Sequence, residues 1–302
     1  MPDIITKLEK KMMFIVNPVA GKKVMEKNLA EVLTVFTKGG YKVTVFPTME
    51  KGDATRYVKA YGKDYDIICC SGGDGTLNET ITGVIDADLK TKVGYIPCGS
   101  TNDFAEYHGL SMDILEAAKN IVAGEIKAID IGAIGDKYFI NSAEFGAFTW
   151  QAYTTSQSLK NYLGGKAYLL GALMDLNRLR SNHLKIEMDG EEFEGDFIFG
   201  VTASSCNIAE KLLKSFRQPV IADDGLFEIG FVMRPNSVPA LNKLYRALKN
   251  NDPNTKFIKF CRCSGTTITT DEPFDWNVDG ELQTMEGTFE IRILHRRINL
   301  MC

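Results

Sequence analysis

The sequence predicts two domains: an α/β domain with a parallel sheet, then a mostly antiparallel β domain. Up to about residue 131, short apolar runs alternate with helical patterns, which is typical of a parallel sheet covered by helices. After about Gly132 the runs are longer, show strand-like alternation and are joined by tight turns. With 302 residues, of which 44% are hydrophobic, the chain can fill two cores of ordinary size.

The first domain opens with an apolar strand pattern, followed by an amphipathic helix pattern that Gly39 and Gly40 end. Each later strand pattern is again followed by helical periodicity, until a last strand pattern closes the series. We predict strands at residues 12–16, 41–46, 66–70, 93–97 and 126–134, and helices at 24–38, 53–61, after Gly75 and at 111–123.

The second domain contains a hairpin signal, because the strand pattern from His183 to Met188 runs into an Asp189-Gly190 turn. No internal repeat or flexible linker marks the boundary, which rests on the change of pattern alone. We assign residues 1–131 to the first domain and 132–289 to the second, with residues 290–302 packing back onto the first. Further strands are predicted at 192–203, 226–233, 256–263, 266–270 and 288–294, and helices at 159–180 and 238–249.

The charge balance narrows the class of partner. A net charge of −4 and a pI near 5.6 argue against nucleic acid as the main partner, because displacing counterions needs a broad basic face. The first eleven residues hold no apolar stretch of signal-peptide length, and no later run is long enough to span a membrane. We therefore expect a cytoplasmic protein without a transmembrane segment.

The seven cysteines form no CxxC pair and lie mainly in apolar strand patterns. We expect them to be reduced thiols of the cores. A zinc site is the weaker alternative, because the three histidines do not cluster with them in the sequence. The cysteines are Cys69, Cys70, Cys98, Cys206, Cys261, Cys263 and Cys302.

The most informative segment for function is SGGDGTLNE, from Ser71 to Glu79, directly after a predicted buried strand. Its three glycines let the backbone approach a ligand and present N–H groups, and Thr76 onward could open a helix whose N-terminus attracts an anion. Asp74 is unusual there, because a carboxylate repels phosphate. Its presence makes sense if a divalent cation lies between them, or if Asp74 handles the proton of an attacking group.

Other predicted strand ends also carry polar turns. The turn from Asn17 to Lys22 contains a glycine and a lysine suited to phosphate, although a plain turn with solvated lysines has the same pattern. The turn from Gly99 to Asp103 can cap a helix, hydrogen-bond a nucleotide, or do both. Because the carboxyl ends of parallel strands border one crevice, we expect these turns, Thr48 and the glycine-rich turn to come together.

The chain carries five motifs in order: NPVAGK at residues 17–22, SGGDGTLNE at 71–79, PCGSTNDFA at 97–105, ADDGLFE at 222–228 and VDGE at 278–281. Together they resemble the diacylglycerol kinase catalytic family, which includes soluble bacterial lipid kinases and the sphingosine and ceramide kinases. The resemblance spans about residues 12–300. It implies an N-terminal nucleotide-binding α/β domain, a C-terminal β-sandwich domain, and an ATP- and Mg²⁺-dependent kinase that acts on a lipid hydroxyl in the cleft between them.

The resemblance also implies site residues. Asp74 and Asp103 match acidic positions linked to the catalytic magnesium. Asp224 matches a side-chain ligand of a structural Mg²⁺, completed by the backbone carbonyls of Ile221 and Leu226, although spacing alone favours a hairpin turn there. The candidate nucleotide contacts are Asn17, Pro18, Val19, Ala20, Gly21, Lys22, Thr48, Gly72, Gly73, Asp74, Gly75, Thr76, Leu77, Asn78, Glu79, Ser100, Thr101 and Asp103.

The VDGE motif supplies the candidate catalytic base. Read alone, Asp279-Gly280 is a common turn with a solvated acid. In the family the acidic pair of this motif lies at the active site, so the resemblance implies that Glu281 accepts the proton of the acceptor hydroxyl, with Asp279 beside it. Asp74 is the competing candidate for that role.

Several alternatives stay open. The turn GGDGT is shared with NAD kinases, and a nucleotide- or lipid-binding protein without turnover is a further reading. The segment from Ser204 to Ala209 departs from the family, which usually has an asparagine and a glycine-rich turn there. The helix predicted at residues 159–180 could line an acyl-chain cleft or touch a bilayer, or pack on its own sheet. The resemblance implies a lipid substrate presented at a membrane surface. A homodimer is an open alternative, and the sequence does not identify the lipid.

Overall fold

The computed structural model describes residues 10–146, 180–204, 221–250 and 255–302. The chain divides into two compact units, one formed by Met1–Ile131 with His295–Cys302 and the other by Gly132–Leu294. The predicted helix at 159–180 lies outside the described residues except for Arg180. The departing segment that begins at Ser204 also lies outside them from residue 205 onward, and so does Cys206.

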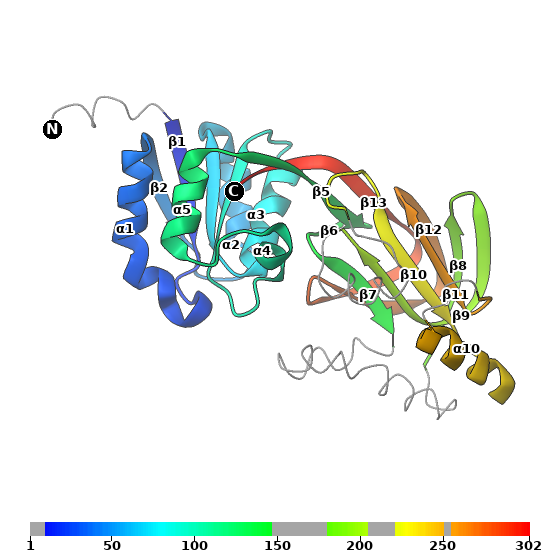
Figure 1. Ribbon diagram of the computed structural model, residues 1–302. Coiled ribbons are helices and arrows are strands. Elements are labelled where there is room, and N and C mark those ends of the chain that lie inside the picture. Colours follow the sequence, from blue (N-terminus) through cyan, green and yellow to red (C-terminus); the bar gives the residue numbers. More distant parts are fainter. Residues whose placement is uncertain (1–9, 147–179, 205–220, 251–254) are drawn as a thin grey trace, which may run out of the picture. The chain divides into compact units, whose positions relative to one another are not determined.

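The first unit contains four parallel strands in the order β2, β1, β3, β4 (Figure 1). The end of β13 (Glu281–Met301) joins this sheet, since Leu300 pairs in parallel with Val93. The strands are β1 (Lys10–Val16), β2 (Tyr41–Pro47), β3 (Ile67–Gly72) and β4 (Lys92–Pro97).

Helices cover both faces of this sheet. α1 (Val24–Lys38) and α5 (Ile114–Ala123) pack on one face in a core that includes Phe14, Phe36 and Cys69. On the other face, the thiol of Cys70 reaches Thr80 of α3 (Asp74–Asp86), and α3 packs against α2 (Asp53–Tyr61). Alternate side chains of β3 thus enter two separate helix layers. Short helical turns complete the unit at η2 (Ala20–Lys23), η3 (Gly62–Asp64) and α4 (Asp103–His108).

The second unit is mostly antiparallel, which confirms that part of the prediction. Its core is aromatic: Phe145, Phe231, Phe274 and Trp276 pack together, and Trp276 is fully buried. Its elements are β6 (Lys137–Phe139), β7 (Ser142–Gly146), β8 (Asn182–Met188), β9 (Glu191–Ala203), β10 (Phe227–Met233), β11 (Ile258–Cys263), β12 (Gly265–Val278) and α10 (Val238–Asn250), while β5 (Ile126–Ile134) and β13 belong to both units.

Several elements differ from the prediction. α3 begins at Asp74 rather than after Gly75, with Gly73 as its N-cap in an extended conformation. α5 begins at Ile114 rather than near residue 111, because Asp113 caps it by accepting the Glu116 N–H. The strands predicted at 266–270 and 288–294 are parts of the longer β12 and β13, and β6, β7 and α4 were not predicted. Among the described cysteines, Cys69, Cys70, Cys98 and Cys263 are buried free thiols.

Candidate active site

The glycine-rich turn lies where β3 ends and α3 begins. Gly72 is the last residue of β3, and the carbonyl of Gly73 accepts the N–H groups of Thr76 and Leu77, which starts the helix. The side-chain amide of Asn17 donates to the Thr76 hydroxyl at 3.2 Å, so the turn after β1 is tied to the start of α3. The predicted strand-turn-helix arrangement is therefore present, with the positive end of the α3 dipole at the turn.

The turn after β4 packs directly against the glycine-rich turn. A Cβ atom on Gly99 would lie 2.5 Å from the Gly73 Cα, so the two backbones can meet only because residue 99 is glycine. Asn102 shapes this turn with its side chain, which accepts the Gly99 N–H at 2.7 Å and donates to the Gly99 carbonyl at 3.1 Å. Ser100 and Thr101 lie exposed between them. Two of the predicted ligand turns thus form one continuous surface.

Asp74 and Asp103 lie next to each other at the junction of these two turns. The Asp74 carboxylate accepts the backbone N–H of Asp103 at 3.0 Å, and both side chains are half-buried. Mg²⁺ in nucleotide sites is usually held by one or two carboxylates together with phosphate oxygens. The two carboxylates are of the kind that can hold such an ion, and their assignment to a catalytic magnesium stays a prediction.

Tyr95 holds the turns after β3 and β4 through its hydroxyl group, a role that the sequence did not reveal. Its hydroxyl donates to the Gly72 carbonyl at 3.3 Å and lies 3.4 Å from the Asn102 side-chain oxygen. Burial raises the pKa of Tyr95, and the nearby Asp74 carboxylate raises it further, so the hydroxyl stays protonated and can donate. In the sequence this tyrosine is only one apolar member of a strand pattern, and nothing there marks the contact.

The turn after β1 joins the same surface. Asn17 donates its N–H to the Ser71 carbonyl at 2.9 Å, and a Cβ on Gly21 would lie 1.9 Å from the Cys98 carbonyl oxygen. Gly21 also has a φ of 52°, which glycine adopts without strain. Val19 at the tip is 72% exposed. Pro18 and Ala20 belong to the same turn, and the Lys22 side chain is outside what the structure describes.

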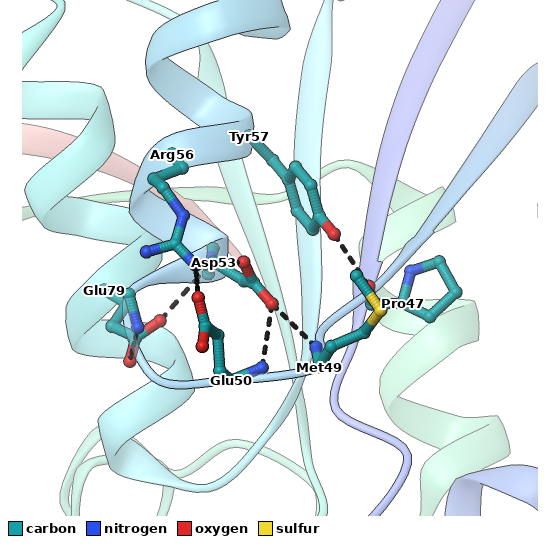
Figure 2. A network of polar contacts seen from close by, with 9 residues as sticks. Pro47, Met49, Glu50, Asp53, Arg56, Tyr57 and Glu79 are labelled. Carbon is teal, nitrogen blue, oxygen red and sulfur yellow. Dashed lines mark hydrogen bonds and ion pairs between the residues drawn. The ribbon is translucent and has the colours of Figure 1, made fainter.

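Thr48 follows β2 and donates its N–H to the Val16 carbonyl at 2.9 Å, which brings the fourth strand end to the same edge of the sheet. The loop after Thr48 is shaped by carboxylates (Figure 2). Asp53 accepts the N–H groups of Met49 and Glu50 at 2.7 and 2.8 Å and forms an ion pair with Arg56. These hydrogen bonds lower the pKa of Asp53.

Three of the predicted nucleotide contacts have side chains bonded or packed within α2 and α3. The Glu79 carboxylate accepts the N–H groups of Gly52 and Ala54 at 2.8 and 3.3 Å, so it holds the start of α2 (Figure 2). Leu77 is fully buried. Asn78 accepts the Thr82 hydroxyl within its own helix at 3.3 Å. These three side chains therefore make contacts within the protein, whereas the glycines form the surface of the turn.

Asp279 and Glu281 have different surroundings in the hairpin between β12 and β13. Asp279 and Gly280 both have positive φ, as a two-residue hairpin turn requires. The Asp279 carboxylate accepts three backbone N–H groups, those of Ile140, Asn141 and Ser142, at 2.6, 2.9 and 3.0 Å. Glu281 is exposed. Asp279 therefore holds a neighbouring loop in place.

In the segment predicted to hold a structural Mg²⁺, the Asp224 carboxylate is paired with an arginine side chain. One Asp224 oxygen accepts the Leu226 N–H at 3.0 Å, and the other forms an ion pair with Arg262. Arg262 of β11 lies opposite Glu228 of β10 and also donates a hydrogen bond to its carboxylate at 3.0 Å. Within the described ranges no group of three or more His, Cys, Asp or Glu side chains could hold a metal. A cation here would have to displace the guanidinium, so these residues do not fit a structural metal.

The fold and the site together define an α/β protein with a second antiparallel unit and a glycine-rich turn suited to phosphate groups. Residues 11–134 match the model of the diacylglycerol kinase catalytic domain family. The chain is 34% identical over 276 residues to a diacylglycerol kinase of Bacillus subtilis (strain 168), covering 90% of each chain. It is 33% identical over 278 residues to a diacylglycerol kinase of Staphylococcus carnosus (strain TM300), covering 91% of this chain and 89% of that one.

A solved structure gives the same assignment. It is a crystal structure of a protein from Bacillus anthracis str. Sterne assigned as a diacylglycerol kinase, with a TM-score of 0.74 and 26% identity, covering 97% of this chain and 96% of that chain. The chain belongs to the diacylglycerol kinase family, and it is an enzyme of the kinase class. In the part of the chain that the structure describes, no helix has both the length and the apolar character needed to cross a bilayer.

Proposed function

We propose that the protein transfers the γ-phosphoryl group of ATP to a lipid hydroxyl, with diacylglycerol or a related long-chain alcohol as the acceptor. The observation that carries this proposal is the meeting of the turns after β1, β3 and β4 at one edge of the parallel sheet. This is the place where open α/β sheets bind nucleotides. The kinase names of the relatives support the reaction type.

The chain's own groups act mainly by binding and orienting the phosphates. The glycine-rich turn presents the N-terminus of α3 to an anion, and Tyr95 and Asn102 keep the turn in shape. Asp74 and Asp103 would hold a Mg²⁺ ion, which when bound neutralises charge on the phosphate oxygens. Positioning and charge neutralisation supply most of the rate enhancement in phosphoryl transfer.

Glu281 is our proposed acceptor of the proton from the lipid hydroxyl. Its carboxylate is exposed at the hairpin, whereas the Asp279 carboxylate is committed to three backbone N–H groups. A carboxylate that accepts three hydrogen bonds is a poor base, because each bond stabilises its charged form. Asp279 is therefore proposed as a positioning residue, and Asp74 stays the alternative base.

The decisive test is transfer from γ-labelled ATP, with Mg²⁺, to a panel of diacylglycerol, sphingoid bases, ceramide, undecaprenol and NAD. We expect a labelled lipid from the wild type and a loss of at least about a hundredfold in Asp74→Asn, because the metal-binding carboxylate is removed. Label in NAD alone would contradict the lipid acceptor and support an NAD-kinase-like activity. ATP binding without any transfer would support the non-catalytic alternative.

We also propose that the protein binds peripherally to the cytoplasmic face of a membrane and takes its lipid substrate from there. Flotation with vesicles that contain the lipid that the enzyme phosphorylates tests this. If the protein does not float with these vesicles although it turns over the same lipid in detergent, the proposal is contradicted. A homodimer stays a prediction, which sedimentation of the purified chain decides.

A further inference from the structure

Arg262 of β11 holds the turn that leads into β10 through two carboxylates. Its Nη2 atom pairs with Asp224 in the turn, and its Nε atom donates to Glu228 of β10 at 3.0 Å. Glu228 lies directly opposite Arg262 in the β10–β11 ladder. The guanidinium thus links a turn to two strands, as a structural cation does when it collects oxygen ligands from a turn.

The two carboxylates need a positive partner because they are largely removed from solvent. Glu228 is 1% exposed, and the side chains of Asp224 and Arg262 are each 24% exposed. The second Glu228 oxygen, Oε2, is buried and has no hydrogen-bond partner within the described residues. Removing the partner of a buried charge is strongly destabilising. Arginine keeps its proton in proteins, so Arg262 supplies this positive charge permanently.

A magnesium ion and Arg262 are alternatives at this turn. Mg²⁺ takes about six oxygen ligands at about 2.0–2.1 Å. One Asp224 oxygen accepts the Leu226 N–H at 3.0 Å, and the other is bonded to the guanidinium. A divalent ion on the second oxygen would lie at contact distance from a like charge, which repels it. The metal can therefore bind only where the guanidinium is absent.

The five sequence motifs do not include position 262. Arg262 lies 38 positions after Asp224, and the antiparallel pairing of β10 with β11 brings it to the turn. A comparison of motifs therefore carries over the aspartate of a metal site without the group that is bonded to it in this chain.

We propose that Arg262 replaces the structural cation that the resemblance implied for the Asp224 turn. The second unit then folds without a metal, and a divalent ion enters the reaction only with the nucleotide. A neutral side chain at position 262 opens the turn to a divalent ion, with Asp224 and Glu228 as its carboxylate ligands. This inference does not rest on the proposed kinase function, because it concerns folding and metal binding without substrate.

The test uses nucleotide-free protein with Mn²⁺ as the probe, and electron paramagnetic resonance to count the bound ion. The full chain carries Asp74→Asn throughout, so that the carboxylate proposed for the nucleotide's metal does not contribute. At about 1 mM Mn²⁺ we expect no bound ion in this background and about one per chain after Arg262→Met. The further change Asp224→Asn should abolish that binding, because it removes a ligand.

Melting temperatures give a second readout. Arg262→Met should melt about 5 °C lower or more, because two carboxylates lose their partner. About 10 mM Mg²⁺ should recover part of this loss and shift the background protein by less than about 1 °C. Arg262→Lys keeps the charge and should not respond to Mg²⁺. Arg292→Met is the matched control, since Arg292 is an exposed arginine with one ion-pair contact at 3.9 Å, and it should leave the melting temperature unchanged.

A Mn²⁺ ion bound in the Asp74→Asn background and lost on Asp224→Asn would overturn the inference, because the turn would then hold a metal beside Arg262. Arg262→Met protein that melts with the background protein would also overturn it. So would Arg262→Met protein that neither binds Mn²⁺ nor responds to Mg²⁺. None of these results bears on phosphate transfer, so the proposed function is decided separately by the labelled-ATP assay.

Discussion

Replacing Asp279 by asparagine should destabilise the second unit, because this carboxylate holds three backbone N–H groups at once. Two of its bonds end on one oxygen, from Asn141 and Ser142, and the third ends on the other, from Ile140. Asparagine keeps one oxygen and turns an amide N–H group toward a backbone donor. At least one buried N–H then loses its acceptor, and the remaining bonds lose their charge.

The size of the effect follows from these losses. A hydrogen bond to a charged group contributes about 1.5–3 kcal/mol, and an unsatisfied buried donor costs about 1–3 kcal/mol. We therefore expect Asp279→Asn to lower the free energy of unfolding by about 3 kcal/mol. A solvated turn residue of the kind suggested by the sequence would change it by less than about 0.5 kcal/mol.

The assay combines urea unfolding with hydrogen exchange at residues 140–142, which reports the loop locally even if the two units unfold separately. Asp271→Asn is the control, since Asp271 is an exposed aspartate on the same strand. Wild-type protection of these amides in Asp279→Asn, together with an unchanged urea midpoint, would refute the structural role. Glu281→Gln should give the opposite result: normal protection and lost turnover.

Three further predictions follow from other contacts. EDTA should leave the melting temperature unchanged, because Arg262 rather than a cation neutralises Asp224. A lower melting temperature after chelation would contradict this. So would a wild-type stability that requires a metal while the stability of Arg262→Met does not. Tyr95→Phe should raise KM for ATP and lower stability by about 1 kcal/mol, because the turn loses its support; titration calorimetry with ATP and thermal unfolding measure both, and unchanged values would exclude the role. The lowered pKa of Asp53 means that its stabilising contribution is present above the usual value of 3.8 and is lost as pH falls through the folded value; acid unfolding of Asp53→Asn should therefore show a shallower pH dependence than the wild type, and an equal slope would contradict it.

The elements that the sequence predicted best have strong local signals. The predicted bounds of α1 and α2 agree with the structure, since glycines stand at the ends of both helices and apolar periodicity fills them. α4 and β7 were missed because they are short: the six residues of α4 make less than two helical turns, and the five residues of β7 give only about two periods of strand alternation. The length of β12 was underestimated because Pro273 interrupts the pattern, at the point where the pairing with β13 shifts register between Thr270 and Phe274.

The site could be predicted only as a set of turns. The glycine-rich turn and its neighbours follow strands whose order a βαβ pattern suggests, so their meeting was expected. The contacts that hold them come from residues without a local signal. Tyr95 bonds to Gly72 across 23 positions, and Asp279 bonds to Ile140 across 139. Such pairs depend on register between distant strands, which periodicity does not specify.

The acidic residues show why this difference matters for assigning function. The matched motifs carry five acids, and because like charges are costly near an anion, their presence in the sequence is an argument against a protein without turnover. In the structure, Asp279 is held by backbone N–H groups and Asp224 by Arg262, so each has a structural reason to be acidic. The case for catalysis then rests on Asp74 and Asp103, which lie together at the turn, and on the exposed Glu281. Loss of turnover in Asp74→Asn with normal folding would therefore weigh more than the number of acids.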